Sequence, residues 1–171
     1  MFTRWMLVWT AVLGMLAAIE TGKVPPLVKL SEDAGGKADG TAWDSSMLRG
    51  KVYVLFYVDP DKKDLNEAFV DVLHKKHYDG KRFGTVAVVN MAATWKPDAI
   101  IEMLLEKKQK AYPRTIYVKD KRKVLVNAWK LADDNSDVLI FGKDGKLLYR
   151  HFGKMSSDEI AKAIKIIESH L

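Results

Sequence analysis

Residues 52–58 read VYVLFYV, a continuous apolar run with three valines and three aromatic residues. The run is too short for an amphipathic helix, and its β-branched and aromatic side chains favour a strand. Because polar and apolar residues do not alternate, both faces of this strand are expected to be buried. The sequence therefore predicts a central strand at Val52–Val58, and the rest of the chain is interpreted around it.

A helix is predicted directly after this strand, because five apolar residues recur at the spacing of one helix face: Leu65, Ala68, Phe69, Val72 and Leu73. Asp61 or Asp64 is expected to cap this helix. A second buried strand is predicted at residues 83–90. Pro97 is expected to open a second helix with three residues facing inward, namely Ile100, Met103 and Leu104.

The C-terminal third of the chain predicts two hairpins and a helix. Short strands are expected at residues 115–118 and 124–128 around a charged turn, and at residues 137–141 and 146–151 around a turn with two glycines. The last helix is expected to begin at Ser156, where Glu159 completes a capping box. Together the elements predict one α/β domain, a mixed sheet covered by helices on both faces.

The first 19 residues read as a secretory signal peptide. Arg4 is followed by a nearly apolar run at residues 5–19, and polar sequence begins at Glu20. The run is shorter than the roughly 20 residues that span a bilayer, so no permanent membrane span is expected. Cleavage near residues 17–20 is predicted, with retention as a tether the alternative. Residues 20–171 then form a single periplasmic domain, whose irregular lead-in contains a short strand near residues 27–30.

The amino-acid composition limits which catalytic groups, cofactors and partners this protein can have. The 171 residues include no cysteine and carry a net charge of +6, which excludes thiolate nucleophiles, covalent haem attachment and cysteine-ligated zinc. The positive charge favours a periplasmic protein or an anionic envelope component as partner, and no nucleic acid is expected. No phosphate-binding loop or catalytic triad order stands out, no cofactor is predicted, and the oligomeric state is left open.

Two segments resemble peroxiredoxins and extracytoplasmic thioredoxin-like proteins: LRGKVYVLFY at residues 48–57 and VLIFGKDGKLLY at residues 138–149. The chain is more closely similar to the bacterial YtfJ family in several further segments, which are ETGKVPP (20–26), WDSSMLRGKV (43–52), DPDKKDLN (59–66), VVN (88–90) and NAWKL (127–131). The resemblance implies an exported protein with a thioredoxin-like fold. That fold has a mixed central β-sheet flanked by helices and an extra peroxiredoxin-like β-hairpin. The family brings no established reaction.

The resemblance also locates a lost redox site. Lys62 and Leu65 stand where redox relatives carry the two cysteines of a Cys-x-x-Cys motif, and Ser136 stands where they carry a cis-proline. None of these side chains replaces a thiolate in disulfide exchange. What remains is the binding edge, where the 59–64 loop meets the 133–137 loop. Trp129 is added because it precedes the second loop, so the candidate binding residues are Asp59, Asp61, Lys62, Asp64, Trp129, Asn135 and Ser136.

These observations support three hypotheses from different classes. The preferred one is a non-catalytic periplasmic binding module on a redox-inactive scaffold. A metal-dependent enzyme that uses the aspartates of the 59–64 loop, or His74 and His77, is an alternative. Helix capping and the lysines between the two histidines explain those residues without a metal, so none is predicted. A transcriptional regulator acting through the basic stretch 97–130 is the third hypothesis, and it conflicts with the export signal.

Overall fold

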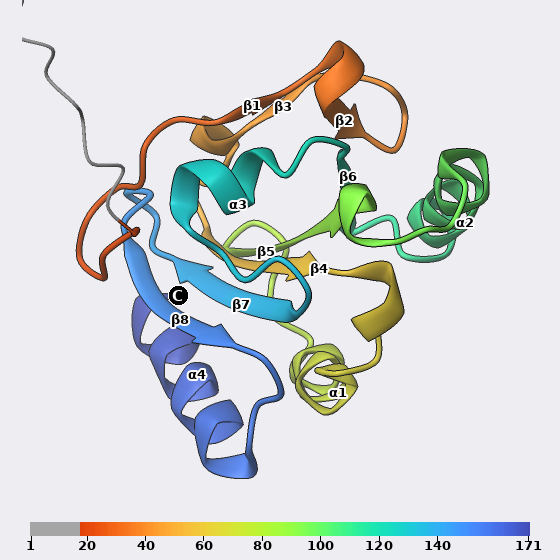
Figure 1. Ribbon diagram of the computed structural model, residues 1–171. Coiled ribbons are helices and arrows are strands. Elements are labelled where there is room, and N and C mark those ends of the chain that lie inside the picture. Colours follow the sequence, from red (N-terminus) through yellow and green to blue (C-terminus); the bar gives the residue numbers. More distant parts are fainter. Residues whose placement is uncertain (1–17) are drawn as a thin grey trace, which may run out of the picture.

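The computed structural model describes residues 18–171, so the predicted signal peptide lies almost wholly outside the described residues. Six strands form one mixed sheet in the order β2-β6-β5-β4-β7-β8 (Figure 1). Their bounds are β2 (Gly35–Lys37), β4 (Val52–Val58), β5 (Phe83–Asn90), β6 (Thr115–Asp120), β7 (Ser136–Phe141) and β8 (Leu147–Phe152). Strands β4, β5 and β6 run parallel to one another. β2 is antiparallel to β6, β7 to β4, and β8 to β7.

Both faces of the sheet are covered. One face carries α3 (Val124–Trp129) and the lead-in, which pairs β1 (Lys29–Leu30) with β3 (Trp43–Asp44). The other face carries α1 (Glu67–Lys76), α2 (Asp98–Ala111) and α4 (Ser157–His170). Short 3-10 helices complete the chain as η1 (Glu32–Ala34), η2 (Ser45–Met47), η3 (Pro60–Lys62) and η4 (Met91–Ala93). None of the described helices is long and apolar enough to cross a membrane.

The predicted central strand is confirmed. β4 pairs with β5 on one side and β7 on the other, and six of its seven residues are buried. Its side chains alternate between two cores, with Leu55 and Tyr57 toward α3 and Val54 and Phe56 toward α1 and α4. The strands predicted at 83–90, 137–141 and 146–151 are also confirmed to within one residue. So is the capping box of Ser156 and Glu159 that opens α4.

The second strand of the first predicted hairpin is wrong, because residues 124–128 lie in α3 and not in a strand. The cause is Asp120 at the end of β6, which is fully buried. Its carboxylate accepts the backbone N–H groups of Arg122, Val124 and Leu125, and so caps the start of α3. The extra hairpin expected here is therefore replaced by β6 followed by α3.

The inward face of α2 also differs from the prediction. Ile101 and Leu105 are buried, whereas the predicted inward residues are exposed, as Ile100, Met103 and Leu104 show. The side chain of Gln109 explains this orientation, because it donates to the carbonyl of Thr115 and accepts the N–H of Tyr117 on β6. Residues 101, 105 and 109 share one helix face, so these bonds fix which face packs on the sheet.

Two further predictions were wrong: the cap of α1, and the irregular conformation of the lead-in around Gly35 and Gly36. α1 begins at Glu67 and not at the predicted caps, and Asp59 instead caps η3. The Gly35-Gly36 pair was expected to be irregular, yet it forms the edge strand β2. Gly35 has φ 128°, and a Cβ there would lie 1.9 Å from the carbonyl oxygen of Lys119. Only glycine lets β2 approach β6 so closely.

Replacing Asp120 by alanine should strongly destabilise the fold. Its four bonds include one from the Tyr57 hydroxyl at 3.0 Å, and Tyr57 is only 1% exposed. Loss of a buried carboxylate that holds several donors is expected to lower the free energy of unfolding by about 3 kcal/mol or more. Urea denaturation measures this value.

Asp39→Ala is the matched control, because Asp39 is exposed and accepts only from Thr41. This variant removes the same charge and should lower the free energy of unfolding by less than about 1 kcal/mol. Equal losses in the two variants would contradict the assigned role of Asp120.

Candidate functional site

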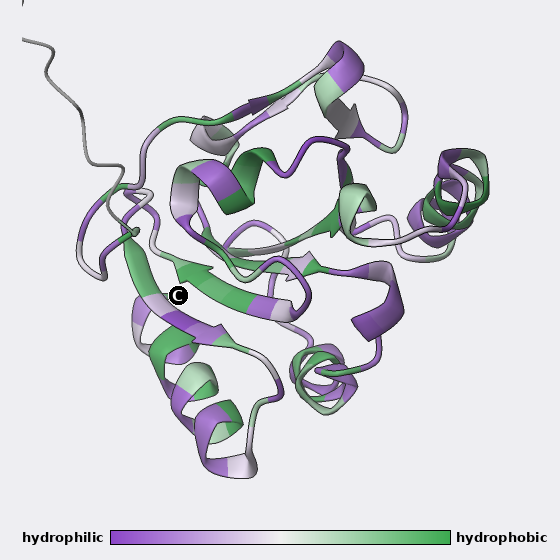
Figure 2. Cartoon of the chain, in the orientation of Figure 1, coloured by the Kyte–Doolittle hydropathy of each residue, from purple (hydrophilic) through white to green (hydrophobic). Residues whose placement is uncertain are grey.

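The two predicted loops lie side by side at one edge of the sheet. Val58 at the end of β4 pairs with Ser136 at the start of β7, and the Asp59 N–H donates to the carbonyl of Asn135 at 2.8 Å. Figure 2 shows η3 and the start of β7 in the hydrophilic colour, while most of β7 is hydrophobic. We call the surface formed by the 59–64 and 133–137 loops the polar edge.

Asp59 is the buried member of the 59–64 loop, with 1% of its surface exposed. Its side chain accepts the N–H of Asp61 at 2.8 Å. Burial raises the pKa of Asp59 above its ordinary value, and a hydrogen bond shared with the Asp134 carboxyl adds to the rise. Asp59 therefore acts mainly as a structural cap that joins the two loops.

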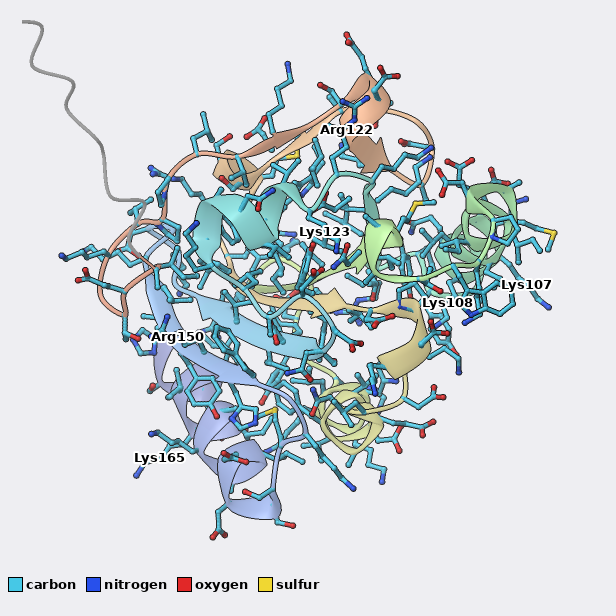
Figure 3. The ribbon with its side chains drawn as sticks, viewed as in Figure 1. Lys107, Lys108, Arg122, Lys123, Arg150 and Lys165 are labelled. Carbon is cyan, nitrogen blue, oxygen red and sulfur yellow. The ribbon has the colours of Figure 1, made fainter. Side chains whose placement is uncertain are left out.

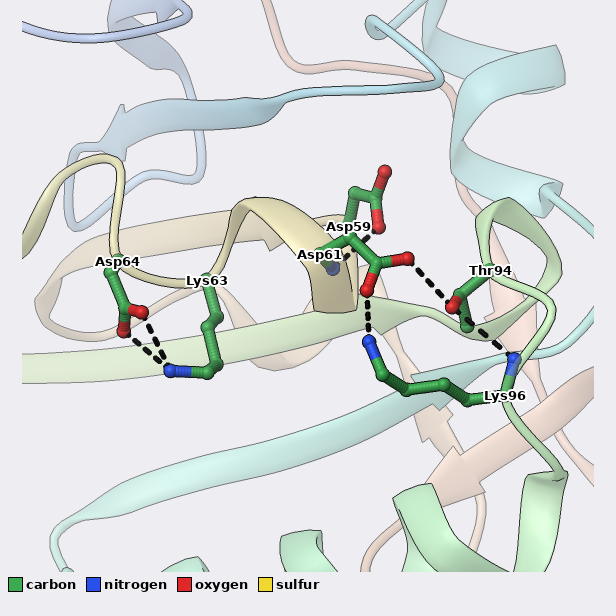
Figure 4. A network of polar contacts seen from close by, with 6 residues as sticks. All are labelled: Asp59, Asp61, Lys63, Asp64, Thr94 and Lys96. Atoms are coloured by element: carbon green, nitrogen blue, oxygen red, sulfur yellow. Dashed lines mark hydrogen bonds and ion pairs between the residues drawn. The ribbon is translucent and has the colours of Figure 1, made fainter.

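The other two aspartates of this loop are paired with cations (Figure 4). Asp61 forms an ion pair with Lys96 and accepts the Thr94 hydroxyl at 2.8 Å. The bond from Lys96 is the main reason that the pKa of Asp61 lies below its ordinary value. Asp64 pairs with its neighbour Lys63 at 2.6 Å. The three carboxylates thus have separate partners.

The histidines do not join these aspartates. His74 stacks on Tyr112 and His77 is the left-handed C-cap of α1, so both lie at the end of the helix away from the 59–64 loop. Within residues 18–171, no three His, Cys, Asp or Glu side chains are grouped so as to hold a metal ion. The arrangement gives no support to the metal-dependent alternative.

A buried amide ties the polar edge to the rest of the fold. Asn66, 4% exposed, donates to the Ser136 hydroxyl and carbonyl and to the Gly153 carbonyl, and it accepts the N–H of Met155. It thereby links the start of α1 to β7 and to the segment before α4. Ser136 itself is 2% exposed. Its hydroxyl is therefore buried beneath the polar edge, where it accepts from Asn66, and is not available to solvent.

An open depression lies over Lys62 and Leu65, the two positions where the resemblance places the cysteines of redox relatives. Its volume is about 460 Å³, and it is lined by Asp61, Lys62, Asp64, Leu65, Glu67, Ala68 and Lys154. Lys62 and Lys154 form no ion pair within the described residues. The depression therefore offers two free ammonium groups, several carboxylates and the apolar surface of Leu65 and Ala68.

Trp129 does not face this depression. It is 0% exposed, packs against Phe141, and donates its indole N–H to the Pro26 carbonyl. The tryptophan that sequence reasoning missed is Trp95, which is 87% exposed. It lies between Thr94 and Lys96, the two residues that contact Asp61. One local feature of the sequence could have indicated that Trp95 is exposed. It lies among polar residues just before Pro97, in a stretch without apolar periodicity.

A second buried carboxylate lies on the α3 side of the polar edge. Asp137 is 0% exposed, and one oxygen accepts the N–H of Ala132 at 2.7 Å while the other has no hydrogen-bond partner. Burial raises the pKa of Asp137 to about 7. Tyr57, opposite it on β4, has its pKa raised by burial and by the nearby Asp120, Asp133 and Asp137. No cation compensates Asp137 within residues 18–171.

Asp137→Asn should stabilise the protein more at pH 8 than at pH 5. The folded state holds the Asp137 proton up to about pH 7, whereas the unfolded chain loses it near 3.8. The stability of the native protein therefore falls through this window and stays low above it. Asparagine removes this penalty, which is at most about 4 kcal/mol. Thermal melts across the pH range measure the difference.

Asp133→Asn is the control for the direction of the pH dependence of stability. The bond from Lys123 lowers the pKa of Asp133, so its removal should reduce stability above that pKa. If Asp137→Asn melts in parallel with the native protein from pH 4 to 8, the buried ionisation assigned to Asp137 is contradicted.

Known proteins resemble the chain in fold and in sequence. An exposed lipoprotein thioredoxin from Streptococcus pneumoniae superposes with TM-score 0.59 and 18% identity, over 82% of this chain and 98% of that one. A thiol-disulfide isomerase from Corynebacterium glutamicum superposes with TM-score 0.61 and 13% identity, over 86% and 96% of the two chains. These similarities show a thioredoxin-like fold, which confirms the predicted fold class.

Two sequence relatives carry no described activity. The uncharacterized protein YtfJ of Escherichia coli is 26% identical over 75% of this chain and 72% of its own length. An uncharacterized protein of Haemophilus influenzae is 26% identical over 83% and 82% of the two chains. The family model described as "Bacterial protein of unknown function (YtfJ_HI0045)" matches residues 29–170. The chain therefore belongs to the YtfJ family.

Proposed function

We propose that this protein is a non-catalytic binding module of the periplasm that engages another protein through its polar edge. The observation that carries the proposal is a thioredoxin-like fold that keeps the edge and lacks every thiol. The fold is the one shared with a thiol-disulfide isomerase, yet the 171 residues include no cysteine. Without a thiolate the scaffold has no nucleophile for disulfide exchange.

The geometry of the edge suits binding. Its two loops are held by hydrogen bonds of the buried side chains of Asp59, Asn66 and Asp137, so little conformational freedom is lost when a partner docks. The depression beside them presents ammonium, carboxylate and apolar groups together. Such a mixed surface matches a protein segment better than a uniformly charged polymer.

The periplasmic location rests on the N-terminal sequence. Arg4 and the apolar run that follows it have the pattern of an export signal. The pneumococcal structural relative is itself described as an exposed lipoprotein, which is consistent with this scaffold working outside the cytoplasm. Export also argues against gene regulation, because the chromosome stays in the cytoplasm.

Photocrosslinking in intact cells tests this function. A photoreactive residue at Lys62, in the depression, should give one reproducible protein adduct, recovered by osmotic shock together with the processed chain. The matched control places the same group at Lys143, an exposed lysine in the β7–β8 turn at the other end of the sheet. It should give no such adduct.

The adduct at Lys62 should weaken when Leu65 is replaced by serine, since Leu65 supplies apolar surface in the depression. Equal labelling from Lys62 and Lys143, or recovery of the unprocessed chain in the cytoplasm, would contradict the proposed function.

A further inference from the structure

A separate surface lies on the outward face of α2. Ile100, Met103 and Leu104 are 47%, 61% and 48% exposed. Together with Lys107 they have the i, i+3, i+4, i+7 spacing that places side chains on one side of a helix. Trp95, 87% exposed, stands three residues before the helix begins. We call Ile100, Met103, Leu104 and Lys107 the α2 stripe.

Cations surround this stripe. Lys107 reaches outward from α2 in Figure 3. Lys107, Lys108 and Lys110 are all exposed, and none of them forms an ion pair within the described part of the chain. Two of the three acidic residues of α2 are paired toward β6, where Glu102 contacts Lys119 and Lys121 and Asp98 contacts Lys121. The unpaired charge on the helix is therefore mainly positive.

The positive charge beside the α2 stripe favours an anionic lipid surface as its partner over a second copy of the chain. In an interface between two copies with two-fold symmetry, the same lysines would face each other, and like charges repel. An anionic lipid surface attracts them. A helix with an apolar stripe, flanking lysines and a tryptophan at one end is the pattern of helices that lie in the interfacial layer of a bilayer. The stripe is also convex, being one side of a single helix, and can enter a bilayer without a complementary groove.

We propose that the α2 stripe docks this protein onto the surface of an anionic phospholipid bilayer, with the apolar side chains in the interfacial layer and the lysines on headgroup phosphates. This goes beyond the proposed function, because the stripe lies outside the polar edge. Thr94 and Lys96 on either side of Trp95 contact Asp61, so docking by α2 would hold the polar edge close to the membrane.

Trp95 provides a direct reporter. In a chain that begins at residue 18 the remaining tryptophans are Trp43, Trp95 and Trp129, and the first and last are fully buried. All three hydrophobic cores are built from this part of the chain, and thermal melting verifies that it is folded. The fluorescence of Trp95 in this chain should shift to the blue when vesicles of equal parts phosphatidylethanolamine and phosphatidylglycerol are added. It should stay unchanged when phosphatidylcholine vesicles are added. Added salt should reduce the binding.

Matched variants separate the stripe from general properties of the surface. Met103→Ser with Leu104→Ser should abolish the blue shift, whereas Val24→Ser with Leu27→Ser, two other exposed apolar residues, should not. Lys107→Glu with Lys108→Glu should lower partitioning about tenfold or more. Lys143→Glu with Lys165→Glu makes the same charge change at two exposed lysines elsewhere and should leave most of the binding. Lys165 lies on α4, away from α2, in Figure 3.

Three results would overturn the proposal. The first is the absence of binding to the anionic vesicles by the folded native chain. The second is an equal loss of binding in the stripe variants and their controls. The third is self-association that the stripe variants abolish, which would assign the stripe to a second copy of the chain. The full-length chain with the same variants should show the same ranking of vesicle affinities.

Discussion

β4 has a hydrogen-bonded strand on each side and packed side chains on each face, and the other elements are placed by the need to cover it. A strand in this position must be apolar along its whole length. The apolar run stops at Val58, and Asp59 follows directly. The abrupt change puts the first polar groups of the loop at the sheet's edge, where β7 begins with Ser136 and Asp137. The position of the candidate site is thus a consequence of where the central strand ends.

The polar edge is built largely from buried polar groups and is not an accidental loop cluster. Asp59, Asn66 and Ser136 are nearly inaccessible. The Asn66 amide bonds to backbone groups of the distant residues Ser136, Gly153 and Met155, and the Asp59 carboxylate accepts the N–H of Asp61 within its own loop. Asp137 holds the segment before β7 through the N–H of Ala132, but one of its oxygens has no partner and its pKa is raised to about 7 by burial. Keeping this carboxyl group buried, with no compensating cation among residues 18–171, lowers the stability of the fold as the pH rises towards 7.

Elements that depend on contacts between residues close in sequence could be predicted from the sequence, whereas those that depend on contacts between distant residues could not. β4, β5, the β7–β8 hairpin and the capping box of α4 follow from local patterns, and the resemblance brought the two loops together correctly. α3 was missed because its cap is Asp120, outside the helix and buried by tertiary packing. The α2 face was misassigned because Ile100 and Leu104 form as good a stripe as Ile101 and Leu105. The burial of Trp129 and exposure of Trp95 depend on packing that no local pattern contains.

The central claim is that the polar edge is a preformed platform, ordered together with the sheet before any partner binds. Native-state hydrogen exchange of individual amides tests it most directly. The Asp59 and Ala132 amides, which donate to Asn135 and Asp137, are predicted to exchange as slowly as the interior amides of β4. Exchange of these two amides at the rate of Gly40 and Thr41, in an exposed turn, would contradict the account.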